Sequence, residues 1–108
     1  MMADHINAYE TAGEEAWMSQ ADMNMGSGTV AKLWEGLKLS LLAYLMQTVD
    51  DPDALQAEET AWMAERDEAL DDVYEEYAGG SVAPMQVAME NSRLTEERFE
   101  ALLELLPQ

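Results

Sequence analysis

The sequence predicts an all-α protein, a small bundle of about four helices with antiparallel connections. Apolar residues recur at spacings of three and four along each main segment, and no segment alternates with the two-residue period of a half-buried strand. Glycine clusters and an Asp-Pro pair separate the segments. The chain has 108 residues, of which 48% are apolar, so it can fold around one core. We therefore expect residues 1–108 to form a single helical domain.

The first expected helix covers about residues 12–25. Thr11 is placed to act as its N-cap, and Glu14 follows three residues later, which is the spacing of a capping box. Gly26 and Gly28 are expected to end this helix, because glycine readily adopts the left-handed conformation found after helix C-termini.

A second helix is expected from an N-cap at Thr29 to about Val49. It is apolar around most of its circumference, which predicts a position at the centre of the bundle. Its apolar residues at helical spacing are Val30, Leu33, Trp34, Leu37, Leu41, Tyr44, Leu45 and Val49.

A third, long helix is expected to run from Asp51 to about Ala78. Asp51 is suited to cap it, Pro52 to occupy its first position and Asp53 to face the positive end of its dipole. The expected inner face consists of Leu55, Trp62, Arg66, Leu70, Val73, Tyr74 and Tyr77. The outer face is strongly acidic, and its candidate binding residues are Asp71, Asp72, Glu75 and Glu76.

The fourth expected helix follows a turn formed by Gly79, Gly80 and Ser81. Pro84 falls in its first turn, where proline is tolerated. Its apolar stripe consists of Met85, Ala88, Met89, Ser92, Phe99, Leu102, Leu103 and Leu106, and the helix stops before Pro107.

The charge of the chain narrows the classes of partner. There are 23 acidic and 5 basic residues, which gives a formal net charge of −18. This charge disfavours nucleic acids and anionic membrane surfaces, whose binding depends on Lys and Arg. Lys32, Glu35 and Lys38 interrupt the longest apolar stretch, so no membrane insertion is expected. A cationic protein is the favoured partner, and a surface that only keeps the protein soluble is the alternative.

The residue inventory argues against an enzyme. The chain has no cysteine and one histidine, His5, so the usual pairs of nucleophile and base cannot form. Adjacent acids such as Glu58 and Glu59 point about 100° apart on a helix and make poor catalytic pairs. No cofactor and no metal are expected, because the ligand patterns of calcium, di-iron and copper sites are missing or better explained by packing.

Two arginines stand out among the few basic residues. Arg66 and Arg98 lie on or beside apolar stripes, although the chain is rich in acids. We expect each to reach a carboxylate through a charge-assisted hydrogen bond and to have a structural role.

The second half of the chain carries a recognisable pattern, Leu-x6-Trp-x3-Arg-Asp, followed by a glycine-glycine-serine turn and a later arginine. The residues are Leu55, Trp62, Arg66, Asp67, Gly79, Gly80, Ser81 and Arg98, supported by Met85, Leu94, Thr95 and Leu102. With these residues the chain resembles the LprI-like lysozyme-inhibitor N-terminal family over about residues 20–106. The family's cysteines are missing here, and Leu70 stands where one would follow the Arg-Asp pair.

The resemblance implies a small helical domain exported to the periplasm or secreted and, for the family's namesake, inhibition of lysozyme. Common lysozymes are cationic, so the charge and the resemblance agree on a lysozyme-like partner. Residues 1–5 do not read as the start of a signal peptide, so a cytoplasmic location stays open. Two other functions also stay open, a structural or adaptor bundle and an acidic mimic of nucleic acid. The sequence does not predict an oligomeric state.

Overall fold

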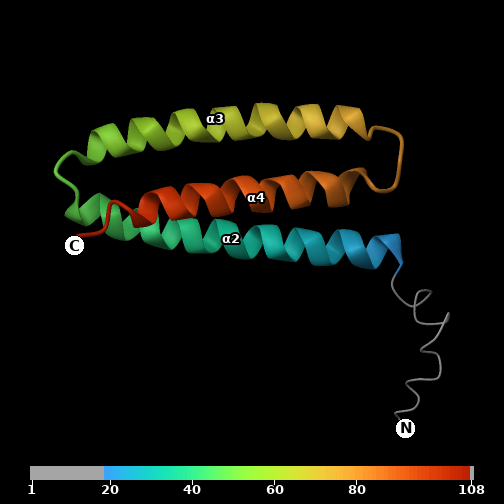
Figure 1. Ribbon diagram of the computed structural model, residues 1–108, viewed down its shortest axis with the longest axis horizontal. Helices are drawn as coiled ribbons and strands as arrows, with labels where there is room; N and C mark the ends of the chain where they lie inside the picture. The colour runs from blue at the N-terminus through green and yellow to red at the C-terminus, as the bar shows by residue number, and fades with distance from the viewer. Residues whose placement is uncertain (1–18, 108) are drawn as a thin grey trace, which may run out of the picture.

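The computed structural model describes residues 19–107 and shows three helices in this range (Figure 1). The helices are α2 (Gln20–Thr48), α3 (Pro52–Glu76) and α4 (Ala83–Leu103), and α3 runs antiparallel to both α2 and α4. The prediction of an all-α fold is therefore confirmed, whereas a bundle of four helices is not. The predicted N-cap at Thr11 lies outside the described residues.

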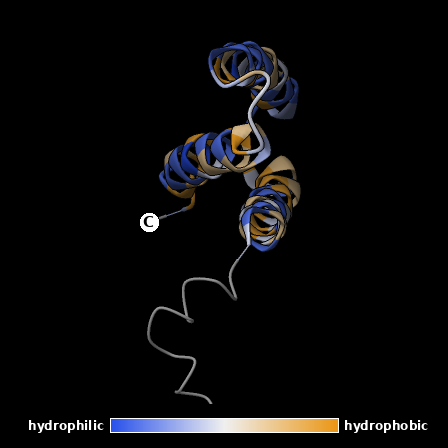
Figure 2. Ribbon diagram, turned by 90° about the vertical axis from the view of Figure 1, so that its right-hand side faces the viewer, coloured by the Kyte–Doolittle hydropathy of each residue, from blue (hydrophilic) through white to orange (hydrophobic). Residues whose placement is uncertain are grey.

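The three helices lie nearly in one layer, with α4 between α2 and α3 (Figures 1 and 2). The Cα atoms extend over 58 × 35 × 15 Å, so the layer is little more than one helix thick. The prediction that the second expected helix lies at the centre of the bundle is wrong. The corresponding part of α2 is at the edge of the layer, and α4 holds the central position.

Helix α2 passes through Gly26 and Gly28 without interruption, so the prediction that these glycines end a helix is wrong. Thr29 does not cap a new helix, because its hydroxyl donates a 3.0 Å hydrogen bond to the carbonyl of Met25 within α2. The Ser27 hydroxyl bonds the Met23 carbonyl in the same way, at 2.8 Å. Such internal bonds keep the polar side chains compatible with a helical backbone.

The observed start of α2 is a capping box formed by Ser19 and Asp22. Asp22 N–H donates to the Ser19 hydroxyl at 3.1 Å, and Ser19 N–H donates to the Asp22 carboxylate at 3.3 Å. This reciprocal pair satisfies two backbone donors that have no partner inside the helix.

The turns around α3 follow the expected residue chemistry. Asp51 caps α3 by accepting a 3.1 Å bond from Ala54 N–H, and Pro52 is the first helical residue. After α3, Gly79 has a φ of +90°, a left-handed conformation in which a Cβ would be strained. Pro84 lies in the first turn of α4, as predicted.

The apolar core is small and lies at one end of the molecule. Leu42 and Leu45 of α2 are buried against Leu55 of α3 and Leu102 of α4. Fully burying one leucine contributes about 1.5–3 kcal/mol, so a cluster of this size stabilises the fold modestly. Farther along α2, Trp34 makes an edge-to-face contact with Phe99 of α4, with ring centroids 5.9 Å apart.

Several residues assigned to inner faces are instead exposed to solvent. They are Val30, Leu33, Leu37 and Tyr44 of α2, Tyr74 of α3 and Met89 and Leu103 of α4. Because a single layer covers each helix on fewer sides than a closed bundle, one flank of α2 has no neighbour. A broad apolar circumference therefore did not indicate a central helix.

Replacing Gly26 or Gly28 with alanine should stabilise the protein. A Cβ at either position would have no neighbouring atom within 4 Å, and alanine in a helix interior is favoured over glycine by about 0.8–1.0 kcal/mol. Urea unfolding would measure the gain for each variant. Gly79→Ala is the control and should destabilise, since Gly79 has a positive φ. A loss of stability in Gly26→Ala would mean that the helix is interrupted there.

Candidate functional site

A buried ionic layer lies next to the leucine cluster and joins all three helices. Its centre is Glu59 of α3, which is 1% exposed. Lys38 of α2, which is 0% exposed, places its Nζ 2.8 Å from Glu59 Oε2. Arg98 of α4 donates from Nε to Glu59 Oε1 at 2.9 Å. One buried carboxylate thus contacts a cation from each of the other two helices.

Two further carboxylates extend the layer toward solvent. Glu58 accepts a 3.1 Å bond from Arg98 Nη1 at the edge of the helix layer. Glu35 lies 3.3 Å from Lys38 Nζ and accepts a 3.0 Å bond from Arg66 Nη1. The acids and bases alternate along this chain of contacts, so each cation lies between two carboxylates or at the end of the chain.

Trp62 completes the layer as an apolar surface between two cations. Lys38 Nζ is 4.5 Å from the centroid of its ring, and the Arg66 guanidinium carbon is 5.0 Å away. Cations at these distances are attracted to the electron-rich face of an indole ring. Trp62 therefore stabilises charges that the interior would otherwise disfavour.

The environment of Glu59 keeps it ionised. Burial by itself would raise the pKa of Glu59, but the hydrogen bonds and positive charges of Lys38 and Arg98 together hold it below the usual 4.5. Not every buried polar atom of the layer has a hydrogen-bond partner. Arg98 Nη2 and Arg66 Nε have none among the described residues, and Lys38 Nζ and Glu59 Oε2 contact each other as an ion pair without hydrogen-bond geometry.

The predictions for the two arginines agree with these contacts. Arg98 and Arg66 both reach carboxylates, as expected from their positions beside apolar stripes. The structure also shows what sequence reasoning missed. Glu59 was considered only as half of an adjacent acidic pair unsuited to catalysis and Lys38 as an interruption of an apolar stretch, yet both are buried. Lys38, a lone base within the apolar stretch of α2, was the available signal.

The other residues of the recognised pattern lie in the core, at the surface and in a turn. Leu55 belongs to the leucine cluster, whereas Asp67 is exposed and its carboxylate lies 3.6 Å from Arg66 Nε. Gly79 and Gly80 form the turn after α3. Ser81 follows them, and its carbonyl accepts a 3.1 Å bond from the Asn24 side chain of α2. These contacts link the turn to the start of α2.

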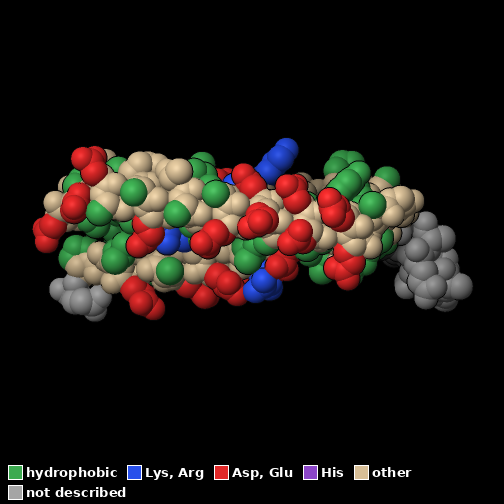
Figure 3. Space-filling view, turned by 90° about the horizontal axis from the view of Figure 1, so that it is seen from above, with side chains coloured by type: hydrophobic (Ala, Val, Ile, Leu, Met, Phe, Trp, Pro, Cys, Tyr) green, Lys and Arg blue, Asp and Glu red, His purple; other side chains and the backbone are tan. Residues whose placement is uncertain are grey.

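The candidate acidic face lies on the C-terminal half of α3, away from the rest of the molecule. Asp71, Asp72, Glu75 and Glu76 are all exposed, and Glu65 and Glu68 extend the same surface. Figure 3 looks onto the outer side of α3 and shows Asp and Glu side chains along it, with few Lys or Arg side chains. We call these six residues the acidic face.

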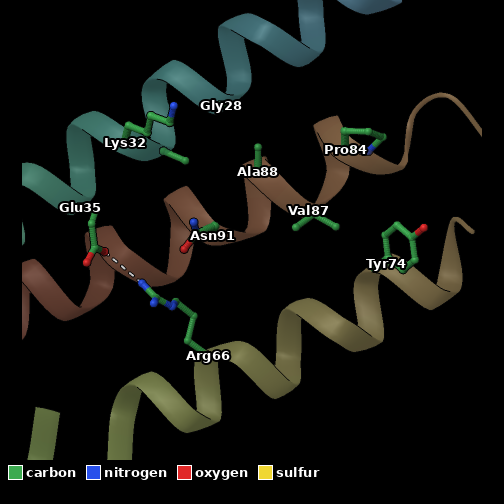
Figure 4. Close-up of a pocket in the computed structure, with 10 residues that line it drawn as sticks. Gly28, Lys32, Glu35, Arg66, Tyr74, Pro84, Val87, Ala88 and Asn91 are labelled. Atoms are coloured by element: carbon green, nitrogen blue, oxygen red, sulfur yellow. Dashed lines mark hydrogen bonds and ion pairs between the residues drawn. The ribbon is translucent and has the colours of Figure 1, made fainter. Parts of the chain in front are cut away.

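An open cleft of about 670 Å³ lies between the helices on the side of the ionic layer away from the leucine cluster. Its walls are mainly apolar, and the Arg66–Glu35 pair lies at one end (Figure 4). The lining residues are Gly28, Ala31, Lys32, Glu35, Arg66, Tyr74, Pro84, Val87, Ala88 and Asn91. Within residues 19–107, no cluster of His, Cys, Asp and Glu has the arrangement of a metal site.

A family model described as lysozyme inhibitor LprI matches residues 11–102. The chain belongs to the LprI lysozyme-inhibitor family. The match includes every residue of the ionic layer and the acidic face. No curated protein and no solved structure matches the chain.

Neutralising Glu59 should be the most destabilising single change in the ionic layer. Glu59→Gln would leave Lys38 and Arg98 close together in the interior without their shared anion, and breaking a buried ion pair costs about 3–5 kcal/mol. Urea unfolding at neutral pH would measure the loss. The control is Glu58→Gln, since Glu58 is adjacent in sequence but 62% exposed and should contribute far less. Equal losses in the two variants would contradict a central role for Glu59.

The advantage of the parent over Glu59→Gln should depend on pH. Because folding lowers the pKa of Glu59, its stabilising contribution is fully present above about pH 4.5 and declines as pH falls through the folded-state value below 4.5. Unfolding free energies of the two proteins should therefore converge in acid and stay apart near neutrality. Using their difference removes most of the general effect of protonating the other acids. A difference that is constant into strong acid would argue against the ionised pair.

Proposed function

We propose that this protein is a non-enzymatic inhibitor that binds a cationic, lysozyme-like protein through the acidic face of α3. The main support is membership of the LprI lysozyme-inhibitor family. The acidic face supplies the chemistry for such binding, because complementary charge steers and orients association.

The pairing of basic residues with carboxylates of the same chain supports this proposal. Lys38, Arg66, Arg93 and Arg98 all lie within ion-pair distance of carboxylates of the same chain. None of these pairs involves a member of the acidic face. The field of that face is therefore free to act on a partner.

The ionic layer gives the acidic face a defined position. Glu59, Trp62 and Arg66 lie on the inner side of α3, opposite the outward-facing acids, and they attach this helix to α2 and α4. A preorganised face loses less conformational freedom on binding than a mobile one. We infer that the recognised family pattern is structural and that the acidic face makes the contact.

We further propose that the chain acts as one domain outside the cytoplasm, in the periplasm or after secretion, where lysozymes are encountered. The family assignment supports this location. In the described part of the chain, no helix combines the length and apolarity that crossing a bilayer requires.

Calorimetric titration against a c-type lysozyme, together with a cell-wall lysis assay, tests the proposal. Neutralising Asp71, Asp72, Glu75 and Glu76 as Asn or Gln should weaken binding about tenfold or more and reduce inhibition in parallel. Binding of the parent should also weaken as salt is raised, because screening shortens the range of the attraction.

The matched control removes four acids from the opposite end of the molecule. Asp50, Asp53, Glu100 and Glu104 are exposed there, so neutralising them changes the net charge equally. This control should bind nearly as well as the parent. Equal weakening of both variants would show that net charge acts without a defined face. Absence of heat and of inhibition at concentrations of tens of micromolar would overturn the lysozyme proposal. Competition with DNA for a DNA-binding enzyme would instead indicate a nucleic-acid mimic.

A further inference from the structure

One exposed flank of α2 carries apolar residues at a strict seven-residue interval. They are Met23, Val30, Leu37 and Tyr44, and Leu33 lies between the second and third of them. All five side chains are at least one-third exposed, and Leu33 is 63% exposed. A repeat of seven places these residues in one line along the helix, as in the seam between two packed helices. We call these five residues the α2 seam.

The α2 seam differs in charge from the rest of the molecule. Between residues 23 and 49, α2 contains one carboxylate, Glu35, and that group points inward to Lys38 and Arg66. Beside Val30, a shallow groove is bordered by Met89, Arg93 and Glu96 of α4, so its charges are of both signs. In a chain with a net charge of −18, this flank is a surface on which two copies can approach without facing rows of acids.

We propose that two copies of this chain associate through the α2 seam and form an antiparallel homodimer. A seven-residue apolar repeat fits another helix, and the same seam on a second copy is the self-complementary surface that a two-fold dimer needs. The small number of carboxylates on this flank favours a second copy over a cationic partner, which the acidic face would attract. The dimer is independent of the proposed lysozyme binding.

The charge distribution favours the antiparallel direction. The acidic face lies at the end of the molecule where α2 begins (Figure 1). The face begins level with Glu35, because Arg66 next to it contacts that residue. A parallel pair would place both acidic faces at the same end of the dimer, whereas an antiparallel pair directs them toward opposite ends. In this arrangement both acidic faces stay accessible.

Sedimentation velocity of the whole chain at about 0.15 M salt, over a range of concentrations, tests the dimer. The parent should sediment as a dimer at high concentration, and Leu37→Glu should sediment as a monomer. Leu39→Glu is the matched control, because Leu39 is on the same helix and similarly exposed, at 48% against 51%, but lies off the seam. It adds the same charge and should leave the dimer intact. Circular dichroism of both variants shows whether each is folded.

Introduced cysteines provide a second measurement that does not depend on weakening the seam. The natural chain has no cysteine, so each variant carries a single thiol. Leu33 is close to the middle of the seam and to the expected two-fold axis, so Leu33→Cys should form a disulfide-linked dimer on oxidation. Met23→Cys, at one end of the seam, should not. Linkage of both variants would indicate a parallel pair. A parent that is monomeric at all concentrations, or equal effects of Leu37→Glu and Leu39→Glu, would overturn the proposal.

Discussion

The contact of Glu59 with Lys38 and Arg98 determines how the three helices fit together. Each helix contributes one of the three charged groups, and all three groups are almost fully removed from water. Burying ions is costly unless their partners are placed accurately, so displacement of any one helix leaves an uncompensated charge. The leucine cluster supplies apolar stabilisation, but leucines tolerate small shifts in register. The ionic layer does not, and we infer that it defines the register of α3 against α2 and α4.

This arrangement also explains how a thin helical layer without disulfides holds together. α2 and α3 are separated by α4 along much of their length, so little apolar surface joins them directly (Figure 2). The Arg66–Glu35 and Lys38–Glu59 pairs span that separation with long side chains. Lysine and arginine also bring apolar stems, which pack where the layer is too open for a leucine core. The chain has no cysteine, so the links between its helices are non-covalent.

The boundaries of the helices could largely be predicted from the sequence, whereas the packing of the helices against one another could not. Asp51, Pro52 and Gly79 gave correct boundaries because capping and turn preferences act within a few residues. The prediction that Gly26 and Gly28 end a helix was wrong because a glycine destabilises a helix only slightly. In addition, the hydroxyls of Ser27 and Thr29 bond to backbone carbonyls within the helix. The ionic layer could be predicted only in part. Arg66 and Arg98 were recognised from their positions beside apolar stripes, whereas Glu59 resembled the many other acidic residues of the chain. Pairing between residues about 20 to 40 positions apart depends on how helices pack, which the periodicity of one helix does not encode.

The interior is arranged in series along the long axis, and this order has a consequence for local motion. The leucine cluster occupies one end, the ionic layer follows, and the open cleft lies beyond it toward the turn at Gly79. Cooperative units of a protein open with free energies that reflect their own contacts. Amide hydrogen exchange should therefore be slowest around Leu45 and Leu102 and become faster toward the cleft. The acidic face lies beside this cleft, so the contacts of Arg66 and Glu59 on the opposite side of α3 are what hold it in position there.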